Sequence, residues 1–319
     1  MKIIIITPAS SRFKNGNLNT AQRWAKYLRE GGHQVKIQQH WDRKKADMMI
    51  ALHARRSYDS IKQFSTLHPN LPLIVVLTGT DLYRDIQTDP NSQESMYLAT
   101  RLLVLQDMGR QELTENYRIK TDVLYQSAMP LSKKTLPKRR FEVSLIGHLR
   151  DEKDPFRSAL ATLLLPYQSK IHITHIGRAM DETMADEARN LMKYNSRYSW
   201  IGEIPHSEVR RKLAHSYLMV ITSKMEGGAN VICEALMGDI PIISSAVSGN
   251  IGMLGKDYAG YFPCGDEKAL AALLWRAESD SVFYSLLKTQ CAERKHYVQP
   301  EKEKAELLNL VKQISEPIF

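Results

Sequence analysis

The chain has 319 residues, 43% of them hydrophobic and 25% charged, which is typical of a globular protein with two domains of roughly 150 residues. The apolar opening Met1–Thr7 is too short for the core of a signal peptide, and no later run approaches the roughly 18 residues that span a membrane. Three cysteines at wide spacings fit neither a disulfide framework nor a zinc site, so we expect a cytoplasmic protein.

The positive charge is concentrated in the first half of the chain. Residues 1–140 hold 23 Lys+Arg and 12 Asp+Glu, a net of +11, whereas residues 141–319 have a net of −2. Such a field attracts nucleic acid, anionic lipid or a small anionic substrate. The sequence has no zinc finger, helix-turn-helix or aromatic-basic platform, which disfavours nucleic acid and favours a small anion.

Short apolar runs alternate with amphipathic helices in the first half. The helix expected over Thr20–Glu30 stops at Gly31-Gly32. The segment Pro130–Arg140, with two prolines and five basic residues, is the expected linker. The expected strands are Lys2–Thr7, Gln34–Gln38, Asp47–Ala51, Leu73–Leu77, Leu102–Leu105 and Asp122–Tyr125.

The second half repeats this alternation. Helices are expected from Asp266 onward, and Pro300 begins a last charged helix. The expected strands are Phe141–Ile146, Ile171–Ile176, Tyr198–Ile201, Tyr217–Ser223 and Pro241–Ser245. The pattern predicts two Rossmann-like α/β/α domains facing across a cleft, residues 1–136 and 137–297, followed by a helix over 298–319 that can pack back on the first.

The most informative motif is the block from Glu226 to Glu234, which starts with Gly227-Gly228 at the junction of a strand and a helix. The helix expected over Asn230–Met237 offers unpaired N–H groups and a partial positive charge to a phosphate, with Asn230 as its N-cap. Glu226 and Glu234 flank that position and can accept hydrogen bonds from sugar or ribose hydroxyls. The motif therefore predicts a nucleotide-linked ligand.

A second candidate loop begins with Gly147, directly after the first strand of the second half. Glycine at a strand end lets the backbone approach a ligand, and Arg150 and Lys153 can neutralise a diphosphate. Read alone, the loop is also consistent with a solvated charged turn. Considered together with the Glu226–Glu234 block, the loop favours a diphosphate site.

Three loops of the first half carry candidate anion contacts. The loop Thr7–Asn17 matches neither the dinucleotide fingerprint nor the P-loop, and is either a mobile surface loop or a cover over an anion. His53 is a candidate proton-transfer group, although a lone histidine is more often structural. Any one of the arginines can instead cap a helix or pair with Asp59 or Asp85. The candidate acceptor contacts are Arg12, Lys14, Gly16, Asn17, Arg55, Arg56, Thr78, Thr80, Asp81 and Arg84.

These residues resemble the retaining glycosyltransferases of family 4, which have the GT-B fold, over almost the whole chain. The resemblance implies that Glu234 holds the ribose of a UDP donor, Glu226 faces the transferred sugar and Lys153 binds the diphosphate. It also implies that Ile204 reads the uracil ring. Where the family has an arginine after the glycine, this chain has His148, and Arg150 can take that role. The backbone contacts implied for the donor are Gly147, Gly228, Ala229, Asn230 and Val231.

A more specific resemblance is to the selenosugar synthases of selenoneine biosynthesis. It rests on the strings IIIITPA, ALHARRS, LTGTDLYRD, GHLRDEKDPFR and EGGANVICEAL, which are spread over both halves. The resemblance implies transfer of N-acetylglucosamine from UDP-N-acetylglucosamine to the selenium of selenophosphate, giving 1-seleno-N-acetylglucosamine, UDP and phosphate. A small, highly charged acceptor agrees with the basic first half.

Two other functions remain open. One is a GT-B glycosyltransferase with a hydroxyl or sugar-phosphate acceptor, which would need His53 or Asp81 as its base. The other is a sensor that binds a nucleotide sugar and transfers nothing. We expect no cofactor or metal, because no Asp-x-Asp motif stands where a divalent ion would bridge the diphosphate. Neither a nucleic acid nor a membrane is an expected partner, while enzymes that supply selenophosphate or use the selenosugar are candidate partners.

Overall fold

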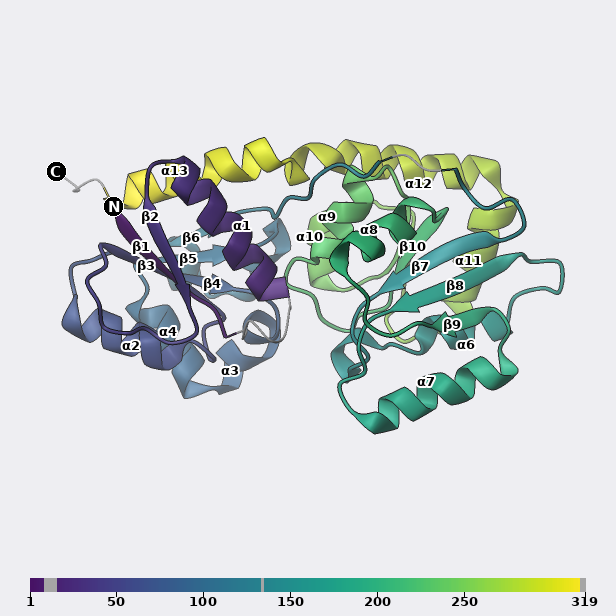
Figure 1. Ribbon diagram of the computed structural model, residues 1–319, viewed down its shortest axis with the longest axis horizontal. Helices are drawn as coiled ribbons and strands as arrows, with labels where there is room; N and C mark the ends of the chain where they lie inside the picture. Colours follow the sequence, from purple (N-terminus) through teal and green to yellow (C-terminus); the bar gives the residue numbers. More distant parts are fainter. Residues whose placement is uncertain (9–15, 133–134, 316–319) are drawn as a thin grey trace. The chain divides into compact units, whose positions relative to one another are not determined.

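The computed structural model describes residues 1–8, 16–132 and 135–315, which form two compact units. The first unit comprises Met1–Ser127, Glu226–Asn230 and Gln299–Phe319, and the second comprises Ala128–Met225 and Val231–Val298. Each unit is built on one six-stranded sheet of parallel strands with helices packed on it (Figure 1). This is the α/β architecture that the alternating pattern predicts.

The sheet of the first unit has the order β2-β1-β3-β4-β5-β6. Its strands are β1 (Lys2–Ile6), β2 (Gln34–Gln38), β3 (Met48–Leu52), β4 (Leu73–Leu77), β5 (Arg101–Val104) and β6 (Thr121–Val123). Its helices are α1 (Gly16–Glu30), α2 (Tyr58–Leu67), α3 (Ile86–Thr88), α4 (Pro90–Leu98), α5 (Glu115–Arg118) and α13 (Pro300–Ser315), with the short turns η1 (Asp81–Asp85) and η2 (Asp107–Glu112). Ile3 and Ile5 pack with α1 and α13, while Ile4 and Ile6 pack with residues of α2 and α4, so β1 is covered on both faces.

The sheet of the second unit has the order β12-β11-β10-β7-β8-β9. Its strands are β7 (Phe141–Ile146), β8 (Ile171–Ile176), β9 (Tyr198–Trp200), β10 (Leu218–Ile221), β11 (Ile242–Ser245) and β12 (Tyr261–Phe262). Its helices are α6 (Arg157–Leu163), α7 (Glu182–Tyr194), α8 (His206–Ala214), α9 (Asn230–Met237), α10 (Ser248–Leu254), α11 (Glu267–Ser279) and α12 (Ser281–Arg294), with the turns η3 (Asp151–Lys153) and η4 (Lys295–Val298). Asn230, the first residue of α9, belongs by its contacts to the first unit.

The strands expected from the sequence are confirmed to within two residues at each end, which is the ordinary uncertainty of strand boundaries. Strand β12 was not predicted, because its two residues are too few to produce a periodic pattern. Helix α1 begins four residues before the expected Thr20. Its extra turn is stabilised because Leu18 is buried and the Thr20 hydroxyl donates a hydrogen bond to the Gly16 carbonyl at 2.9 Å.

Two helices end next to glycine with different backbone geometry. After α1, Gly32 adopts a left-handed φ of 84°, as a C-terminal glycine should. After α9, the left-handed residue is Asp239, with φ 57°, one position after Gly238. Helix α9 ends at Met237, as predicted.

Helix α13 is attached to the first unit by a buried carboxylate, Glu303, whose side chain is fully buried. Arg23 donates to it through Nε at 2.7 Å and Nη2 at 3.0 Å, and Trp24 donates through Nε1 at 2.7 Å. The backbone N–H and the hydroxyl of Ser127 also donate to it. In Figure 1 the yellow helix α13 lies along α1, consistent with these contacts. A buried charge with this many donors fixes the position of α13 on the unit.

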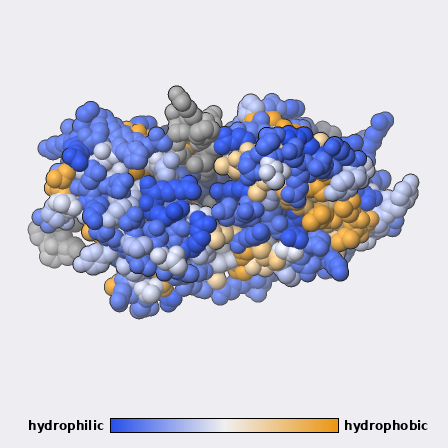
Figure 2. Space-filling model, turned by 90° about the horizontal axis from the view of Figure 1, so that it is seen from below, coloured by the Kyte–Doolittle hydropathy of each residue, from blue (hydrophilic) through white to orange (hydrophobic). Residues whose placement is uncertain are grey.

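The described part of the chain contains no helix with the length and hydrophobicity needed to cross a bilayer. The exposed hydrophobic residues are unevenly distributed, and Figure 2 shows a large orange area on the second unit. That unit exposes Leu160 and Leu163 of α6, together with Leu164 and Tyr167 just after it.

Candidate functional site

The strand order of the second unit locates the best ligand position in its sheet. In an open parallel sheet, ligands bind at the carboxyl ends of the strands. The preferred position lies between the two neighbouring strands from which the chain continues in opposite directions across the sheet. Here β7 has β8 on one side and β10 on the other, so this position lies between β7 and β10. Gly147 directly follows β7, and Thr222 directly follows β10.

Hydrogen bonds join the two loops at this position. The Thr222 hydroxyl donates to the carbonyls of Lys153 and Asp154, both at 2.9 Å, and the Lys224 N–H donates to the Glu152 carbonyl at 2.9 Å. The stem of Lys153 lies beside Gly147, because a Cβ at Gly147 would be 3.8 Å from its Cδ. The fold therefore brings together Gly147 and Lys153, two of the predicted donor contacts.

Arg150 carries an unusual feature in this loop. Its Nε is buried and has no hydrogen-bond partner among the described residues. A buried guanidinium N–H left without an acceptor costs free energy, so such a group is completed by an ordered water or a ligand. His148, the residue at the family's arginine position, instead accepts a hydrogen bond at Nδ1 from the Arg178 N–H at 3.1 Å. Burial lowers the pKa of His148, which favours its neutral form.

His175 is a buried residue that was not among the predicted site residues. It contacts the Gly147 loop through a hydrogen bond. Its Nε2 is 3.1 Å from the Gly147 carbonyl, and its Nδ1 is 2.8 Å from the Tyr198 hydroxyl. A carbonyl can only accept, so Nε2 carries the hydrogen and Nδ1 accepts from Tyr198. Burial lowers the pKa of His175 to about 4, and the imidazole is neutral at physiological pH. A side chain at Gly177 would clash with the Gly147 carbonyl, so the glycine allows the two loops to pack this closely.

Glu234 contacts His206, a partner that the sequence did not indicate. Its Oε1 is 2.6 Å from Nε2 of His206, the first residue of α8, and its side chain is only 10% exposed. Ile204, the predicted uracil contact, lies two residues before His206. The structure thus brings the segment Ile204–His206 next to Glu234, as a site for the nucleoside would require.

We expect Glu234→Ala to weaken UDP binding about 30-fold, because the family resemblance implies that this carboxylate accepts from two ribose hydroxyls, a contact worth about 2 kcal/mol. Isothermal titration of the full chain with UDP measures this. Glu293→Ala, which removes an exposed carboxylate of α12, is the matched control and should bind as the wild type does. Unchanged UDP affinity in Glu234→Ala would show that this carboxylate serves only His206.

The segment Glu226–Asn230 packs within the first unit. A Cβ at Gly227 would collide with the backbone of Thr78, and a Cβ at Gly228 would be 2.6 Å from the Cβ of Leu105, which explains the glycine pair. Glu226 is 8% exposed and Ala229 7% exposed. Asn230 is the first helical residue of α9 rather than the residue before it, and its Oδ1 accepts a hydrogen bond from Arg23 at 3.3 Å. Val231 is half-buried and belongs to the second unit.

In the first unit, the loops after β3 and β4 meet at Asp81. This fully buried carboxylate accepts from the N–H groups of Thr78 and Gly79, both at 2.9 Å, and from the N–H of Ala54 at 3.0 Å. Both of its oxygens are therefore used to hold the two loops together. The geometry assigns Asp81 a structural role in joining the two loops.

His53 lies in the same junction with a left-handed φ of 74°, a conformation that is strained for a residue with a side chain. Its Nε2 is 3.1 Å from the Thr80 hydroxyl, and its Nδ1 is 3.8 Å from Oδ2 of Asp81. Burial lowers the pKa of His53 and outweighs the opposing effect of Asp81, so the imidazole is neutral.

The arginines of these loops differ in their surroundings. Arg55 and Arg84 both pair with Asp85, at 2.7 Å and 3.1 Å, one of the alternatives that the sequence left open. Two cations on one carboxylate still leave a net positive charge, and Arg56 beside them is exposed. Gly16 and Asn17 form the start of α1, whereas Arg12 and Lys14 lie outside the described residues.

Comparison with known proteins identifies the family and the fold of the chain. The family model described as "Glycosyl transferases group 1" matches residues 131–296, about half of the chain. A relative from Xenopus tropicalis, glycosyltransferase 1 domain-containing protein 1, is 27% identical over 119 residues, and the match covers 36% of this chain and 34% of that protein. The match thus spans only about a third of that relative's length.

Two solved structures are similar over almost the whole chain. HepE from Anabaena, crystallised in complex with UDP and glucose, has a TM-score of 0.79 at 13% identity, covering 98% of this chain and 100% of that one. Sucrose-phosphate synthase from Thermosynechococcus elongatus has a TM-score of 0.79 at 15% identity, covering 98% of both chains. The predicted GT-B fold is confirmed, and the chain belongs to the glycosyl transferases group 1 family.

Proposed function

We propose that the protein transfers a sugar from a UDP-sugar to a small anionic acceptor, and specifically N-acetylglucosamine from UDP-N-acetylglucosamine to the selenium of selenophosphate. The observation that carries the donor half is the buried Arg150 Nε without a described partner, next to Gly147 and Lys153 at the ligand position of the second sheet. A UDP-sugar donor is further supported by the UDP and glucose bound to the similar HepE.

The acceptor half rests on charge and on the specific sequence resemblance. The first 140 residues have a net charge of +11, and Arg55, Arg56 and Arg84 are grouped at the ends of two neighbouring strands. Selenophosphate is anionic at neutral pH and its selenium is a strong nucleophile. Such an acceptor needs positioning and charge neutralisation more than a general base.

The proposed reaction proceeds in two balanced steps. Selenium attacks the anomeric carbon as the bond from that carbon to the UDP oxygen breaks, and UDP leaves with both electrons of that bond. Arg150 and Lys153 stabilise the charge that develops on the diphosphate. Water then cleaves the Se–P bond and releases phosphate.

A second candidate is transfer to a hydroxyl, including that of a sugar phosphate, and the His53 geometry favours it. A neutral imidazole beside Asp81 and Thr80 has the protonation state of a base, as such an acceptor would require. His53→Gln should then abolish transfer to a hydroxyl acceptor while leaving UDP affinity unchanged.

The test is an acceptor comparison with UDP-N-acetylglucosamine as the donor. Selenophosphate, thiophosphate, phosphate and a panel of hydroxyl acceptors are incubated separately with the full chain, and UDP release and product mass are measured. A selenium-containing sugar from selenophosphate, with little turnover of phosphate, supports the proposal. Turnover of a hydroxyl acceptor alone supports the second candidate, and tight UDP-sugar binding with no turnover at all indicates a sensor.

We expect Arg56→Ala to raise the acceptor KM about tenfold and to leave the donor KM within twofold, because it removes an exposed cation from the acceptor side only. Steady-state kinetics with each substrate varied in turn measures both constants. Lys26→Ala, on the exposed face of α1, controls for loss of one positive charge. A larger change in the donor KM would place the acceptor elsewhere.

We also propose that protein cations neutralise the diphosphate without a divalent ion. Activity should then be the same in excess EDTA and in added Mg²⁺ or Mn²⁺. Loss of activity in EDTA that is restored by one of these ions would contradict this part of the proposal.

A further inference from the structure

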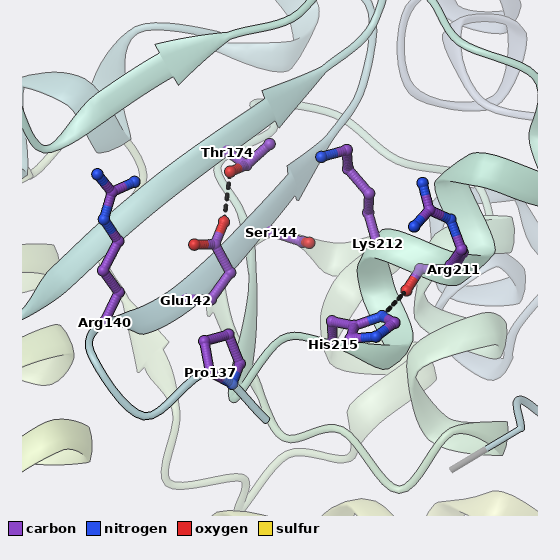
Figure 3. A pocket seen from close by; sticks show the side chains of 8 residues that line it. All are labelled: Pro137, Arg140, Glu142, Ser144, Thr174, Arg211, Lys212 and His215. Atoms are coloured by element: carbon purple, nitrogen blue, oxygen red, sulfur yellow. Dashed lines mark hydrogen bonds between the residues drawn. The ribbon is translucent and has the colours of Figure 1, made fainter. Parts of the chain in front are cut away.

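A second polar pocket lies in the second unit, at the end of the sheet opposite to Gly147. It is an open cavity of about 300 Å³ between the start of β7, the middle of β8 and the last turn of α8. Glu142, on its wall, precedes Gly147 by five strand positions, or roughly 16 Å along β7. The side chains that line it are Pro137, Arg140, Glu142, Ser144, Thr174, Arg211, Lys212 and His215 (Figure 3).

Cations reach this pocket from two separate elements. Arg140 ends the basic segment Pro130–Arg140, for which the proposed transfer reaction has no use, while Arg211 and Lys212 come from α8. Arg211 is paired with Glu208 at 2.9 Å. Neither Arg140 nor the half-buried Lys212 has a carboxylate within ion-pair distance among the described residues. Two cations from distant parts of the sequence thus line one cavity, and the carboxylate of Glu142 lies between them without forming an ion pair with either (Figure 3).

The carboxylate in the pocket is already compensated by its own neighbours. Burial disfavours ionisation of Glu142, but the nearby His172 ring and the hydrogen bond donated by the Thr174 hydroxyl outweigh it and keep the Glu142 pKa below its usual value. In Figure 3 the Glu142 side chain lies between those of Arg140 and Lys212. Oε2 of Glu142 is 3.7 Å from His172 Nδ1, so this oxygen can accept a further hydrogen bond from a ligand hydroxyl.

The floor of the pocket adds hydroxyl groups. The Ser144 hydroxyl, which lines the pocket, shares a hydrogen bond of 2.7 Å with Ser216 and has a lone pair left for another donor. His215 donates from Nδ1 to the Arg211 carbonyl at 2.7 Å, which leaves its Nε2 for a ligand. Cations on the rim with hydroxyl and carboxylate acceptors inside match a ligand that has a phosphate at one end and hydroxyls at the other.

We propose that this pocket binds a small sugar phosphate, with its phosphate held by Arg140 and Lys212 and its hydroxyls held by Glu142 and Ser144. The volume fits a single hexose phosphate and lies at the lower end of ordinary ligand sites. The site is distinct from the proposed donor site, because His206, which contacts Glu234, starts α8 and Lys212 lies near its end, about 9 Å further along the axis. This proposal does not depend on which acceptor the enzyme uses.

The test is isothermal titration of the full chain with glucose 6-phosphate in the presence of saturating UDP, which occupies the proposed nucleotide site. We expect binding of glucose 6-phosphate, much weaker binding of inorganic phosphate, and none of glucose. Lys212→Gln and Arg140→Gln should each weaken binding at least about fivefold. Lys193→Gln on α7 is the matched control, since it removes an exposed lysine outside the pocket.

Three results would overturn the proposal. The first is no binding of glucose 6-phosphate up to about 10 mM. The second is binding that Arg55→Gln abolishes and Lys212→Gln leaves unchanged, which would place the ligand in the first unit. The third is an equal affinity for inorganic phosphate and glucose 6-phosphate, which would show that Glu142 and Ser144 do not contact the sugar hydroxyls. A further variant, Ser144→Ala, tests the sugar contact directly and should weaken glucose 6-phosphate binding without changing that of phosphate.

Discussion

Arg150→Ala is expected to lower kcat/KM for the sugar donor about 100-fold, equivalent to about 2.7 kcal/mol, with little loss of stability. The physical reason is the buried Nε without a described partner. If that group is completed only by the diphosphate, removing it weakens the transition state, in which charge develops on the leaving group, and relieves an unsatisfied donor in the free protein. Steady-state kinetics and thermal unfolding measure the two effects.

Two variants make this prediction specific. Arg150→Lys keeps the charge but loses the planar donor group, so it should have an intermediate activity. Arg189→Ala, on the exposed surface of α7, removes an arginine that is paired with Asp186 and should leave kcat/KM unchanged. A normal kcat/KM in Arg150→Ala together with lost stability would show that the guanidinium is a structural group.

His175 is expected to make the second unit sensitive to acid. Its pKa is about 4 in the folded protein and about 6.5 in an unfolded chain, so between these values the unfolded state binds more protons. Stability from this group is therefore complete above pH 6.5 and falls as the pH decreases toward 4, by about 3 kcal/mol in total. From pH 7 to pH 5 the loss is about 2 kcal/mol.

Hydrogen exchange of the β7 and β8 amides at pH 7 and pH 5 reports this change within the second unit. His175→Gln is the informative variant, because its amide can still donate to the Gly147 carbonyl but does not titrate. It should lose about 2 kcal/mol less than the wild type over the same pH range. An identical pH dependence in both proteins would contradict the assignment.

The same residue links stability to the proposed donor site. His175→Met removes the hydrogen bond to Gly147, so we expect it to raise the KM for the UDP-sugar, whereas His175→Gln should stay close to the wild type at pH 7. A purely structural role would lower the stability of both variants without separating their KM values. The pair of substitutions thus distinguishes a residue that positions the loop from one that only fills the core.

Local signals in the sequence were sufficient for most of the strands and helices. Runs such as Leu73–Leu77 are buried on both faces of a parallel sheet, so they are apolar throughout and easy to recognise. Helix α9 was predicted with its observed bounds, Asn230–Met237, because its apolar positions recur at helical spacing and end before a glycine. Where the pattern was too short, as in the two residues of β12, the prediction failed.

The amino-acid sequence by itself determined two α/β units, a glycine-rich turn at the start of α9 between Glu226 and Glu234, and a basic first half. Only the tertiary structure decided which side chains meet. His175 and Gly147 are 28 residues apart, as are His206 and Glu234, and Arg55 is 30 residues from Asp85. Their contacts depend on the order of the strands, because neighbouring strands in a parallel sheet bring together loops that are distant in the chain. The same physical reason places Arg140 and Lys212 on one pocket, although nothing in their local sequence relates them.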